Sequence, residues 1–408
     1  MKTLYLHIGH SKTGSSYLQS VFGLNAGTLA RHGVHYPADQ DTKRAAQGKI
    51  TSGNGKHLLL MMKRFITQGR TPDELLLGDR RSTLLSSEAL IGFLTCAPGF
   101  SSVSGPMREF WQDWNAMERI RVVTEWMKAH GFERVSVLLF IRNPISHFSS
   151  AYQQQVKRLG ATETIDERAD KYFLPNTVLT FLKQAKAHPE ITVEVRNYSV
   201  VGHDLRGVVS DWLRVPQAEL TSPEIGRINR SMTAAELELQ RCLNMVLGPC
   251  GDLLSDPLCE KLPHIPSDPI HPSPQAQDRL WRRLRPSMEG VNEQIKILHH
   301  YRFDRIDGWK PPDRHHFSSD QLHVIGNSIG KAIQSLRNRV AEHEAASSST
   351  VATLQERISM LDSELAKAVA TPEPARAPSE APPYSGSLRD RLFQRFRHIT
   401  RKAIERDP

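Results

Sequence analysis

A short apolar run that leads directly into a loop of glycine and hydroxyl residues constrains the fold of this chain more than any other feature. The stretch LYLHIGHSKTGSSYLQS covers residues 4–20. Its apolar part predicts a strand over 3–8, and the periodicity after the loop predicts a helix over 15–31. A loop between a strand and a helix N-terminus directs backbone N–H groups and the helix dipole at one point, which favours a bound phosphate or sulfate.

Strands and helices alternate along the first half of the chain. The run RVSVLLFI at 134–141 is the most apolar, which suits a strand buried on both faces of a parallel sheet. A helix should follow it to residue 159, with Pro144 at its first position and Asn143 as its cap. The other predicted strands and helices cover 82–90, which runs into a polar turn, 116–130, 191–199 and 203–214. The alternation predicts an α/β fold, a doubly wound parallel sheet with flanking helices.

The chain after residue 215 is predicted to be mainly helical. Helical patterns cover 233–246, 275–298 and 318–340. A loop with five prolines lies at 262–274, and it either rims a substrate cleft or is a plain surface excursion. We expect residues 1–340 to form the main domain.

The tail divides into three predicted parts. Residues 341–370 form a short coiled-coil helix, 371–386 a Pro/Ala/Ser-rich linker, and 387–408 a basic amphipathic helix. Self-association through 351–369 is a hypothesis that the heptad spacing favours. The last part has seven basic and three acidic residues, which suits peripheral contact with an anionic membrane, a partner protein, or a weakly ordered tail.

Composition and charge narrow the classes of function. The formal net charge is +9, which suits a polyanionic ligand or an anionic surface, and no motif for reading nucleic acid is visible. No apolar run reaches 18 residues, and the apolar stretch at the N-terminus is too short for a signal peptide. We therefore expect a cytoplasmic protein, peripheral on the inner membrane face if its tail binds there.

The cysteines and histidines do not predict a metal site. The spacing of the cysteines fits no zinc pattern, and the histidine pairs have no partner at metal-ligand spacing. We expect no bound metal and ordinary buried thiols at Cys96, Cys242, Cys250 and Cys259.

The loop itself favours an anion other than the phosphates of a nucleoside triphosphate. A triphosphate-binding loop has the pattern G-x-x-x-x-G-K-[ST], whereas this loop has G-x-x-K-T-G-S-S, with Lys12 before Gly14. No acidic residue follows an apolar strand in the manner of such enzymes. These differences make an ATP-dependent small-molecule kinase the less favoured of two hypotheses for the function.

The stretch HIGHSKTGSSYLQ resembles the 5′-phosphosulfate loop of sulfotransferases that use 3′-phosphoadenosine 5′-phosphosulfate (PAPS). It is most similar to the bacterial branch, as is HGVHYP at 32–37. The resemblance implies a P-loop-like sulfotransferase fold, PAPS as the sulfuryl donor and the bisphosphate PAP as product. The implied loop contacts are His10, Ser11, Lys12, Thr13, Gly14, Ser15 and Ser16.

Two later segments resemble other motifs of the same family. FIRNPISHFSSAY at 140–152 is similar to the 3′-phosphate motif, which implies that Arg142 and Ser150 contact this phosphate. An arginine at the carboxyl end of a strand, beside a helix N-terminus, is independently suited to bind phosphate. Tyr198 matches the next strand of the family, although Ser199 replaces its acid; Tyr198 fits a core aromatic residue equally well.

The chemistry implied is an in-line sulfuryl transfer that needs a stabilised leaving group and a base. Lys12 is placed to meet the charge that grows on the leaving phosphate oxygen. Glu88, which follows a strand, is the first candidate base, and His57 is the alternative. We expect a hydroxyl or amine acceptor, a carbohydrate or glycolipid by analogy with the bacterial branch. A third hypothesis is a non-catalytic adaptor with a vestigial nucleotide site.

Overall fold

The structure is a computed structural model that divides into two compact units, Met1–Gln334 and Ser335–Pro408. It describes residues 1–10, 12–37, 39–47, 51, 53–69, 82–96, 110–111, 113–223, 230–306 and 315–370. The predicted linker at 371–386 and the predicted basic helix at 387–408 lie outside the described residues.

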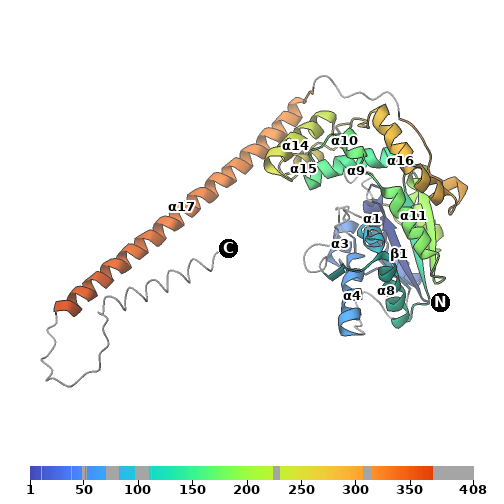
Figure 1. Cartoon of the computed structure of the whole chain (residues 1–408), viewed down its shortest axis with the longest axis horizontal. Helices are drawn as coiled ribbons and strands as arrows, with labels where there is room; N and C mark the ends of the chain where they lie inside the picture. Colours follow the sequence, from blue (N-terminus) through green and yellow to red (C-terminus); the bar gives the residue numbers. More distant parts are fainter. Residues whose placement is uncertain are drawn as a thin grey trace, which may run out of the picture. The chain divides into compact units, whose positions relative to one another are not determined.

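Five parallel strands form one sheet in the first unit, which confirms the predicted α/β fold (Figure 1). The strand order is β2-β3-β1-β4-β5, and each neighbouring pair is parallel. The strand bounds are β1 Thr3–Gly9, β2 Val34–His35, β3 Ser82–Ser87, β4 Arg134–Ile141 and β5 Ile191–Asn197. The central strand β1 therefore has β3 on one side and β4 on the other, and all three end at the same edge.

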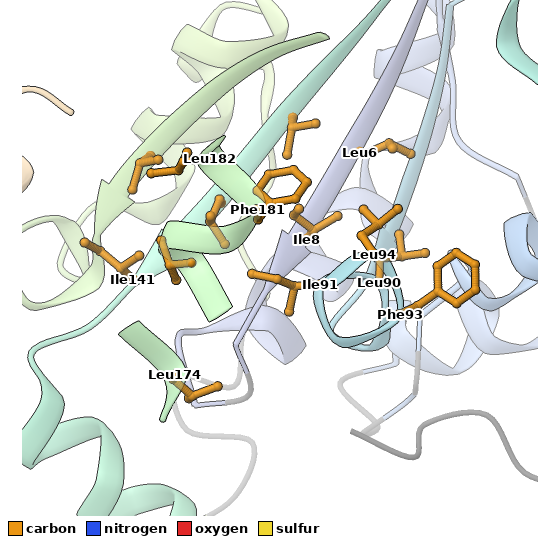
Figure 2. Close-up of a cluster of buried hydrophobic side chains, with 14 of the residues drawn as sticks. Leu6, Ile8, Leu90, Ile91, Phe93, Leu94, Ile141, Leu174, Phe181 and Leu182 are labelled. Carbon is orange, nitrogen blue, oxygen red and sulfur yellow. The ribbon is translucent and has the colours of Figure 1, made fainter. Parts of the chain in front are cut away.

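Helices cover both faces of the sheet. The side chains of β4 alternate, so Leu139 and Ile141 join one buried cluster while Leu138 and Phe140 join the other. Figure 2 shows part of the first cluster, in which Ile8 of β1 packs among side chains from two helices. Those helices are α6 (Ala89–Thr95) and α11 (Leu174–Ala185). The sheet is thus buried on both sides, as the apolar run at 134–141 predicted.

The remaining helices of the described chain complete these layers and the helical C-terminal part. Their bounds are α1 Ser15–Leu24, α2 Ala26–Arg31, α3 Gln40–Ala46, α4 Lys56–Gln68, α8 Ala116–Ala129, α9 Pro144–Leu159, α10 Ile165–Ala169, α12 Tyr198–Val201, α13 Leu205–Leu213, α14 Ala234–Leu247, α15 Ser255–Lys261, α16 Pro274–Asn292 and α17 Ser319–Ala370. Short 3₁₀ turns lie at Gln217–Glu219 and Ile297–His299.

The helix predicted over 15–31 is two helices, divided at Asn25. The Asn25 side-chain amide donates to the carbonyls of Val21, at 2.7 Å, and Thr221, at 2.8 Å. Its side-chain oxygen accepts a hydrogen bond from the Thr221 backbone N–H at 2.7 Å. The prediction missed this break because Asn25 is held by a segment 196 residues away.

Three other predicted elements end earlier than expected. The strand predicted over 82–90 ends at Ser87, and α6 begins at Ala89 instead of a polar turn. The strand predicted to residue 199 ends at Asn197, whose side chain accepts a hydrogen bond from the Ser199 N–H and begins α12. The helix predicted to residue 298 ends at Asn292, whose side chain bonds both backbone groups of Tyr301. In the last two, a local asparagine hydrogen bond replaces the regular backbone ladder.

The helix α9 begins at Pro144, as predicted, but its cap differs from the prediction. Asn143 occupies the cap position and makes no side-chain capping bond. Its amide instead donates to Asp304 at 2.9 Å, and its side-chain oxygen accepts a hydrogen bond from Asn197 at 3.0 Å. Asn143 therefore links the chain just after β4 to the last residue of β5 by a hydrogen bond.

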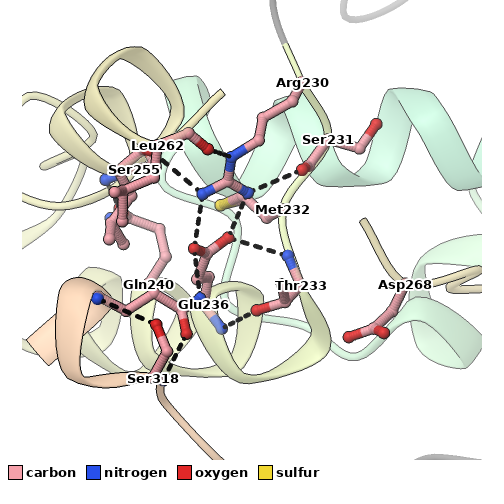
Figure 3. A network of polar contacts seen from close by, with 12 residues as sticks. Arg230, Ser231, Met232, Thr233, Glu236, Gln240, Ser255, Leu262, Asp268 and Ser318 are labelled. Atoms are coloured by element: carbon pink, nitrogen blue, oxygen red, sulfur yellow. Dashed lines mark hydrogen bonds and ion pairs between the residues drawn. The ribbon is translucent and has the colours of Figure 1, made fainter. Parts of the chain in front are cut away.

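A buried ion pair anchors the helical part of the first unit (Figure 3). Arg230 and Glu236 are bound through two hydrogen bonds of 2.7 Å, and their side chains are 2% and 0% exposed. Gln321, in the first turn of α17, donates to the same carboxylate at 2.7 Å. This contact fixes the start of α17 against α14.

The second unit contains the rest of α17. The sequence predicted separate helices over 318–340 and 341–370, whereas the structure has one helix from Ser319 to Ala370. Its residues after 335 are exposed wherever their side chains are described.

Two of the four cysteines differ from the expectation of buried thiols. Cys250 and Cys259 are buried, but Cys96 and Cys242 are exposed, and all four are free. None of the helices in the described ranges has the length and apolar content to cross a membrane.

Candidate functional site

The loop between β1 and α1 is held in a compact, strained conformation. Lys12 has a φ of 67°, which is unusual for a residue with a side chain, and Gly14 has a φ of 83°. A Cβ atom on Gly14 would lie 2.5 Å from Leu205 Cδ1 and 3.0 Å from the Tyr198 ring. The Thr13 hydroxyl donates to the His10 carbonyl at 2.6 Å. The loop therefore requires glycine at 14, and its shape is fixed by contacts with α12 and α13.

Arg142, at the end of β4, lies directly against this loop. Its Nη1 donates to the Lys12 carbonyl at 3.0 Å, and its Nε donates to the Ser146 hydroxyl at 3.3 Å. The guanidinium carbon lies 5.5 Å from the centre of the Tyr198 ring. The structure thus brings together the two predicted anion-binding segments, which are 130 residues apart in the chain.

The sheet topology explains why these segments meet. β1 and β4 are adjacent parallel strands, so the loops after them leave the same edge of the sheet. The helices that follow take opposite faces, since Leu18 of α1 belongs to one buried cluster and Phe148 of α9 to the other. In open α/β sheets, ligands usually bind at the strand edge where successive helices take opposite faces in this way.

The charge of Lys12 is affected by burial and by charged groups of both signs. Burial lowers the pKa of Lys12, the Glu88 carboxylate raises it, and the charges of Lys157 and Arg158 on α9 lower it. Lys157 and Arg158 are themselves paired with Asp256. Glu88 is therefore the main charged neighbour of the Lys12 ammonium within the described fold.

Glu88 lies at the carboxyl end of β3, immediately before α6. Burial raises the pKa of the Glu88 carboxyl above its ordinary value, although the Ser15 hydroxyl and the Lys12 ammonium act in the opposite direction. Glu88 therefore faces the loop residues, and its carboxylate is a stronger base than that of an ordinary exposed glutamate.

His10 offers unused hydrogen-bonding capacity beside the loop. Its side chain is 1% exposed, and within the described residues neither of its ring nitrogens has a hydrogen-bond partner. Burial lowers the pKa of His10 to about 4, so the ring is neutral at pH 7 and has one donor and one acceptor. Its ring centre lies 5.5 Å from that of His147 on α9. A buried polar group without a partner destabilises the fold unless a ligand satisfies it.

His57, the alternative base, is paired with a carboxylate. Its Nε2 lies 2.7 Å from Asp39 Oδ2, at the start of α3. Burial alone would raise the pKa of Asp39, but hydrogen bonds from Thr42 and from His57 lower it below its ordinary value. The segment before His57 lies along β3, because the Gly55 N–H donates to the Ser86 carbonyl at 3.0 Å. Both candidate bases are therefore positioned by the end of the same strand.

The remaining predicted cofactor contacts are serines. Ser15 is buried and Ser16 is partly buried in the first turn of α1. Ser150 is partly buried on α9, one turn beyond Ser146. Ser11 lies outside the described residues.

Sequence reasoning missed several residues that surround Arg142. Ser146 contacts Arg142 from the first turn of the helix predicted after it, and its hydroxyl at this position was the available signal. Tyr172 is buried and bonds the ring of His147 at 3.1 Å; burial raises its pKa well above the ordinary tyrosine value, and the charge of Arg142 acts against that effect. Nothing in the sequence pattern places Tyr172 near this site.

The proline-rich loop at 262–274 also reaches this region. His271 Nδ1 lies 2.9 Å from the Ser149 hydroxyl of α9, and Ile270 is buried. Burial lowers the pKa of His271, and the charge of Arg142 lowers it further. The loop is therefore packed beside Arg142 instead of being a plain surface excursion, and its role at the rim of a substrate cleft stays a prediction.

Asn54 and Gln19 are two further residues that the sequence analysis did not identify, and both bond near the segment that precedes His57. Asn54 accepts a hydrogen bond from the Ser86 N–H at 2.8 Å, and the Gln19 side chain accepts one from Thr51 at 3.0 Å. Among the described residues, the amide nitrogens of Asn54 and Gln19 are buried without an acceptor. The Gly-Asn-Gly sequence at 53–55 was the available signal, because it is typical of a tight turn.

In the described part of the chain, no group of three or more His, Cys, Asp or Glu side chains is arranged to hold a metal ion.

Comparisons with known proteins do not show a family for this chain. No protein-family model matches it, and no curated protein sequence matches it. Among solved structures, it is similar to retinol dehydratase in complex with androsterone and the inactive cofactor PAP. The sequence identity is 10% and the TM-score 0.26, over 72% of this chain and 82% of that one. A similarity this low carries no argument about fold or function.

Proposed function

We propose that this protein is a PAPS-dependent sulfotransferase that transfers a sulfuryl group to a hydroxyl or amine acceptor. The acceptor class we propose is a carbohydrate or glycolipid. The observation that carries the proposal is the 3.0 Å hydrogen bond from Arg142 to the Lys12 carbonyl. It joins the loop suited to one anionic group with the arginine suited to another.

The residues around this contact fit a ligand with two anionic groups. Lys12, the N–H groups at the start of α1 and the hydroxyls of Ser15 and Ser16 would hold the phosphosulfate, together with Ser11, Thr13 and Gly14. Arg142 and Ser150 would hold the 3′-phosphate, and the Tyr198 ring lies against Arg142. The unpaired ring nitrogens of His10 supply a further donor, which an anionic ligand would satisfy.

The chemistry divides between Glu88 and Lys12. When bound, PAPS supplies the sulfuryl group, which passes to the acceptor oxygen as its bond to the phosphate oxygen breaks. Glu88 accepts the proton of the acceptor hydroxyl, for which its raised pKa is suited. The Lys12 ammonium stabilises the negative charge left on the phosphate oxygen.

His57 is the alternative acceptor of the proton. Its contact with Asp39 resembles the arrangement in which a carboxylate orients a catalytic imidazole. Glu88 is preferred because the charge of Lys12 acts on it directly, whereas the described contact of His57 is with Asp39.

Calorimetry with PAP and with ATP tests the proposal. We expect PAP to bind tightly in the presence of EDTA and ATP to bind weakly with or without magnesium. Lys12→Ala should weaken PAP binding, while the control Lys43→Ala, an exposed lysine on α3, should not. Tight magnesium-dependent binding of ATP without binding of PAP would support the kinase instead.

Transfer of labelled sulfate tests the acceptor class separately. With PAPS as donor, we expect labelling of hydroxyl groups in a panel of oligosaccharides and glycolipids. Labelling of small phenols or steroids alone would reject the carbohydrate class while leaving the sulfotransferase assignment intact.

A further inference from the structure

A row of exposed apolar side chains follows one face of the second half of α17. Val351, Leu354, Ile358, Leu361 and Leu365 are between 53% and 58% exposed. Their spacing alternates between three and four residues, which keeps them on one side of a helix. Within the described residues this helix has no tertiary partner along the row, so the apolar side chains remain in water.

The residue types along the row indicate a particular partner. In heptad notation, Val351, Ile358 and Leu365 occupy the a positions, and Leu354 and Leu361 the d positions. Two of the three a residues, Val351 and Ile358, are β-branched, and β-branched residues at a with leucine at d favour two parallel helices. The pattern stops on the N-terminal side, because the preceding a and d positions are Glu344 and Ser347.

We propose that α17 pairs in parallel and in register with α17 of a second copy of this chain. The seam extends over residues 351–365. It buries the apolar row of each copy against the other and makes the protein a homodimer, independently of what the catalytic unit does.

Charge complementarity favours a second copy of α17 as the partner and a parallel orientation of the two helices. Arg357 occupies the g position and Asp362 the following e position, and both are exposed. In a parallel pair in register, Arg357 of each chain faces Asp362 of the other, which gives two attractive contacts. In a single helix these residues are five positions apart and do not face one another.

Sedimentation velocity of the full chain over a wide range of protein concentration tests the pairing. We expect a reversible monomer–dimer equilibrium, because a seam of little more than two heptads is short. The double variant Leu354→Asp/Leu361→Asp should raise the dissociation constant by roughly a hundredfold or more. The matched control is Met360→Asp, which is 65% exposed but lies at a c position, off the seam, and should leave the equilibrium unchanged.

Charge reversal tests the orientation. Arg357→Glu should weaken the dimer by roughly tenfold, and Arg357→Glu/Asp362→Arg should restore it. Leu361→Cys in a background lacking the exposed Cys96 and Cys242 should form a disulfide between copies under mild oxidation. Circular dichroism of each variant shows whether the helix itself is retained.

Three results would overturn the proposal. A monomer at every concentration, or a dimer equally insensitive to the Leu354/Leu361 and Met360 variants, excludes the seam. Failure of both the charge-reversal rescue and the Leu361→Cys cross-link excludes the parallel orientation. None of these readouts depends on PAPS binding or turnover, so they stand apart from the proposed function.

Discussion

Arg230, which is buried, and Arg142, which is partly buried, lie in the same unit but have opposite surroundings, and the difference separates a structural contact from a binding site. All five N–H groups of Arg230 have acceptors: the Glu236 carboxylate and the carbonyls of Leu262, Ser231 and Leu258 (Figure 3). Arg142 donates to one carbonyl and one hydroxyl, and in the described residues its Nη2 donates no hydrogen bond.

The pKa values of the two arginines shift in opposite directions, which agrees with this difference in their surroundings. Burial alone would lower the pKa of Arg230, but the Glu236 carboxylate raises it above its ordinary value. Burial lowers the pKa of Arg142, and the tyrosines Tyr198 and Tyr172 act against that effect. Among the residues that the structure describes, no carboxylate has a resolved effect on the pKa of Arg142. Arg230 is therefore neutralised within the fold, whereas Arg142 has capacity left for an anion from outside it.

The largest expected effect is on stability, from Arg230→Ala. Removing this arginine leaves the Glu236 carboxylate buried without its partner, which should lower the free energy of unfolding by about 3–5 kcal/mol. Urea denaturation followed by circular dichroism measures the change.

The control for this variant is an exposed ion pair. Arg121→Ala removes a contact between Arg121 and Glu125 whose side chains are 62% and 54% exposed, and it should cost less than about 1 kcal/mol. Equal losses in the two variants would mean that the Arg230 network does not anchor the helical part.

Glu88→Gln should have the next largest effect, on turnover. A general base contributes roughly a hundred- to ten-thousandfold, and glutamine cannot accept the proton. In the wild type, turnover should fall as the pH drops through the raised pKa of Glu88, above the ordinary glutamate range, because the base is then protonated. The residual activity of the variant should lack this acidic limb.

Steady-state rates measured across pH with PAPS and a fixed acceptor test this assignment. PAP affinity should stay nearly unchanged in Glu88→Gln. An unchanged acidic limb in that variant, together with its loss in His57→Ala, would transfer the base assignment to His57.

Lys12→Ala should lower turnover by about a hundredfold or more if the ammonium stabilises the leaving group. The pKa of Lys12 is lowered, so in the wild type PAP affinity should fall as the pH rises through a value below that of an ordinary lysine. Lys12→Arg, which stays charged, should retain PAP affinity at alkaline pH. A wild type whose PAP affinity is constant up to the ordinary lysine range would contradict this role.

Arg142→Ala should separate binding from stability, the reverse of Arg230→Ala. Losing a charged hydrogen-bond donor should weaken PAP binding by roughly ten- to a hundredfold. Stability should change less than in Arg230→Ala, because the variant leaves no buried carboxylate unpaired. A loss of stability without a change in PAP affinity would show that Arg142 only fastens the loop.

The sequence predicted those parts of the molecule whose physical cause is local. The strand at 134–141 was predicted with correct ends, because its apolar run is bounded by Arg134 and by the Asn-Pro pair that starts α9. The loop at 9–16 was identified from its own donors and glycines. The parallel sheet followed from the alternation of short apolar runs with helical patterns.

Features that depend on distant residues could not be predicted. The break at Asn25 depends on Thr221, and the position of Arg142 against Lys12 depends on which strands are neighbours. Tyr172 lies between α10 and α11, in a stretch for which the sequence predicted no element, and His271 lies in the proline-rich loop, so neither local pattern indicates a place near the site. The continuity of α17 was missed because its middle, rich in Ala and Ser, lacks an apolar face.

The smallest expected effect distinguishes two serines on the same face of α9. Sequence resemblance points to Ser150 as a phosphate contact, whereas the structure has Ser146 bonded to Arg142 at 3.3 Å. If Ser150 donates to the anion, Ser150→Ala should weaken PAP binding by roughly three- to tenfold, the cost of one hydrogen bond. Ser146→Ala should have a smaller effect, because Arg142 keeps its contact with the Lys12 carbonyl. Calorimetric titration of both variants with PAP decides between them: the opposite order would make Ser146 the phosphate contact, with Arg142 held in place by the ligand it shares with that hydroxyl.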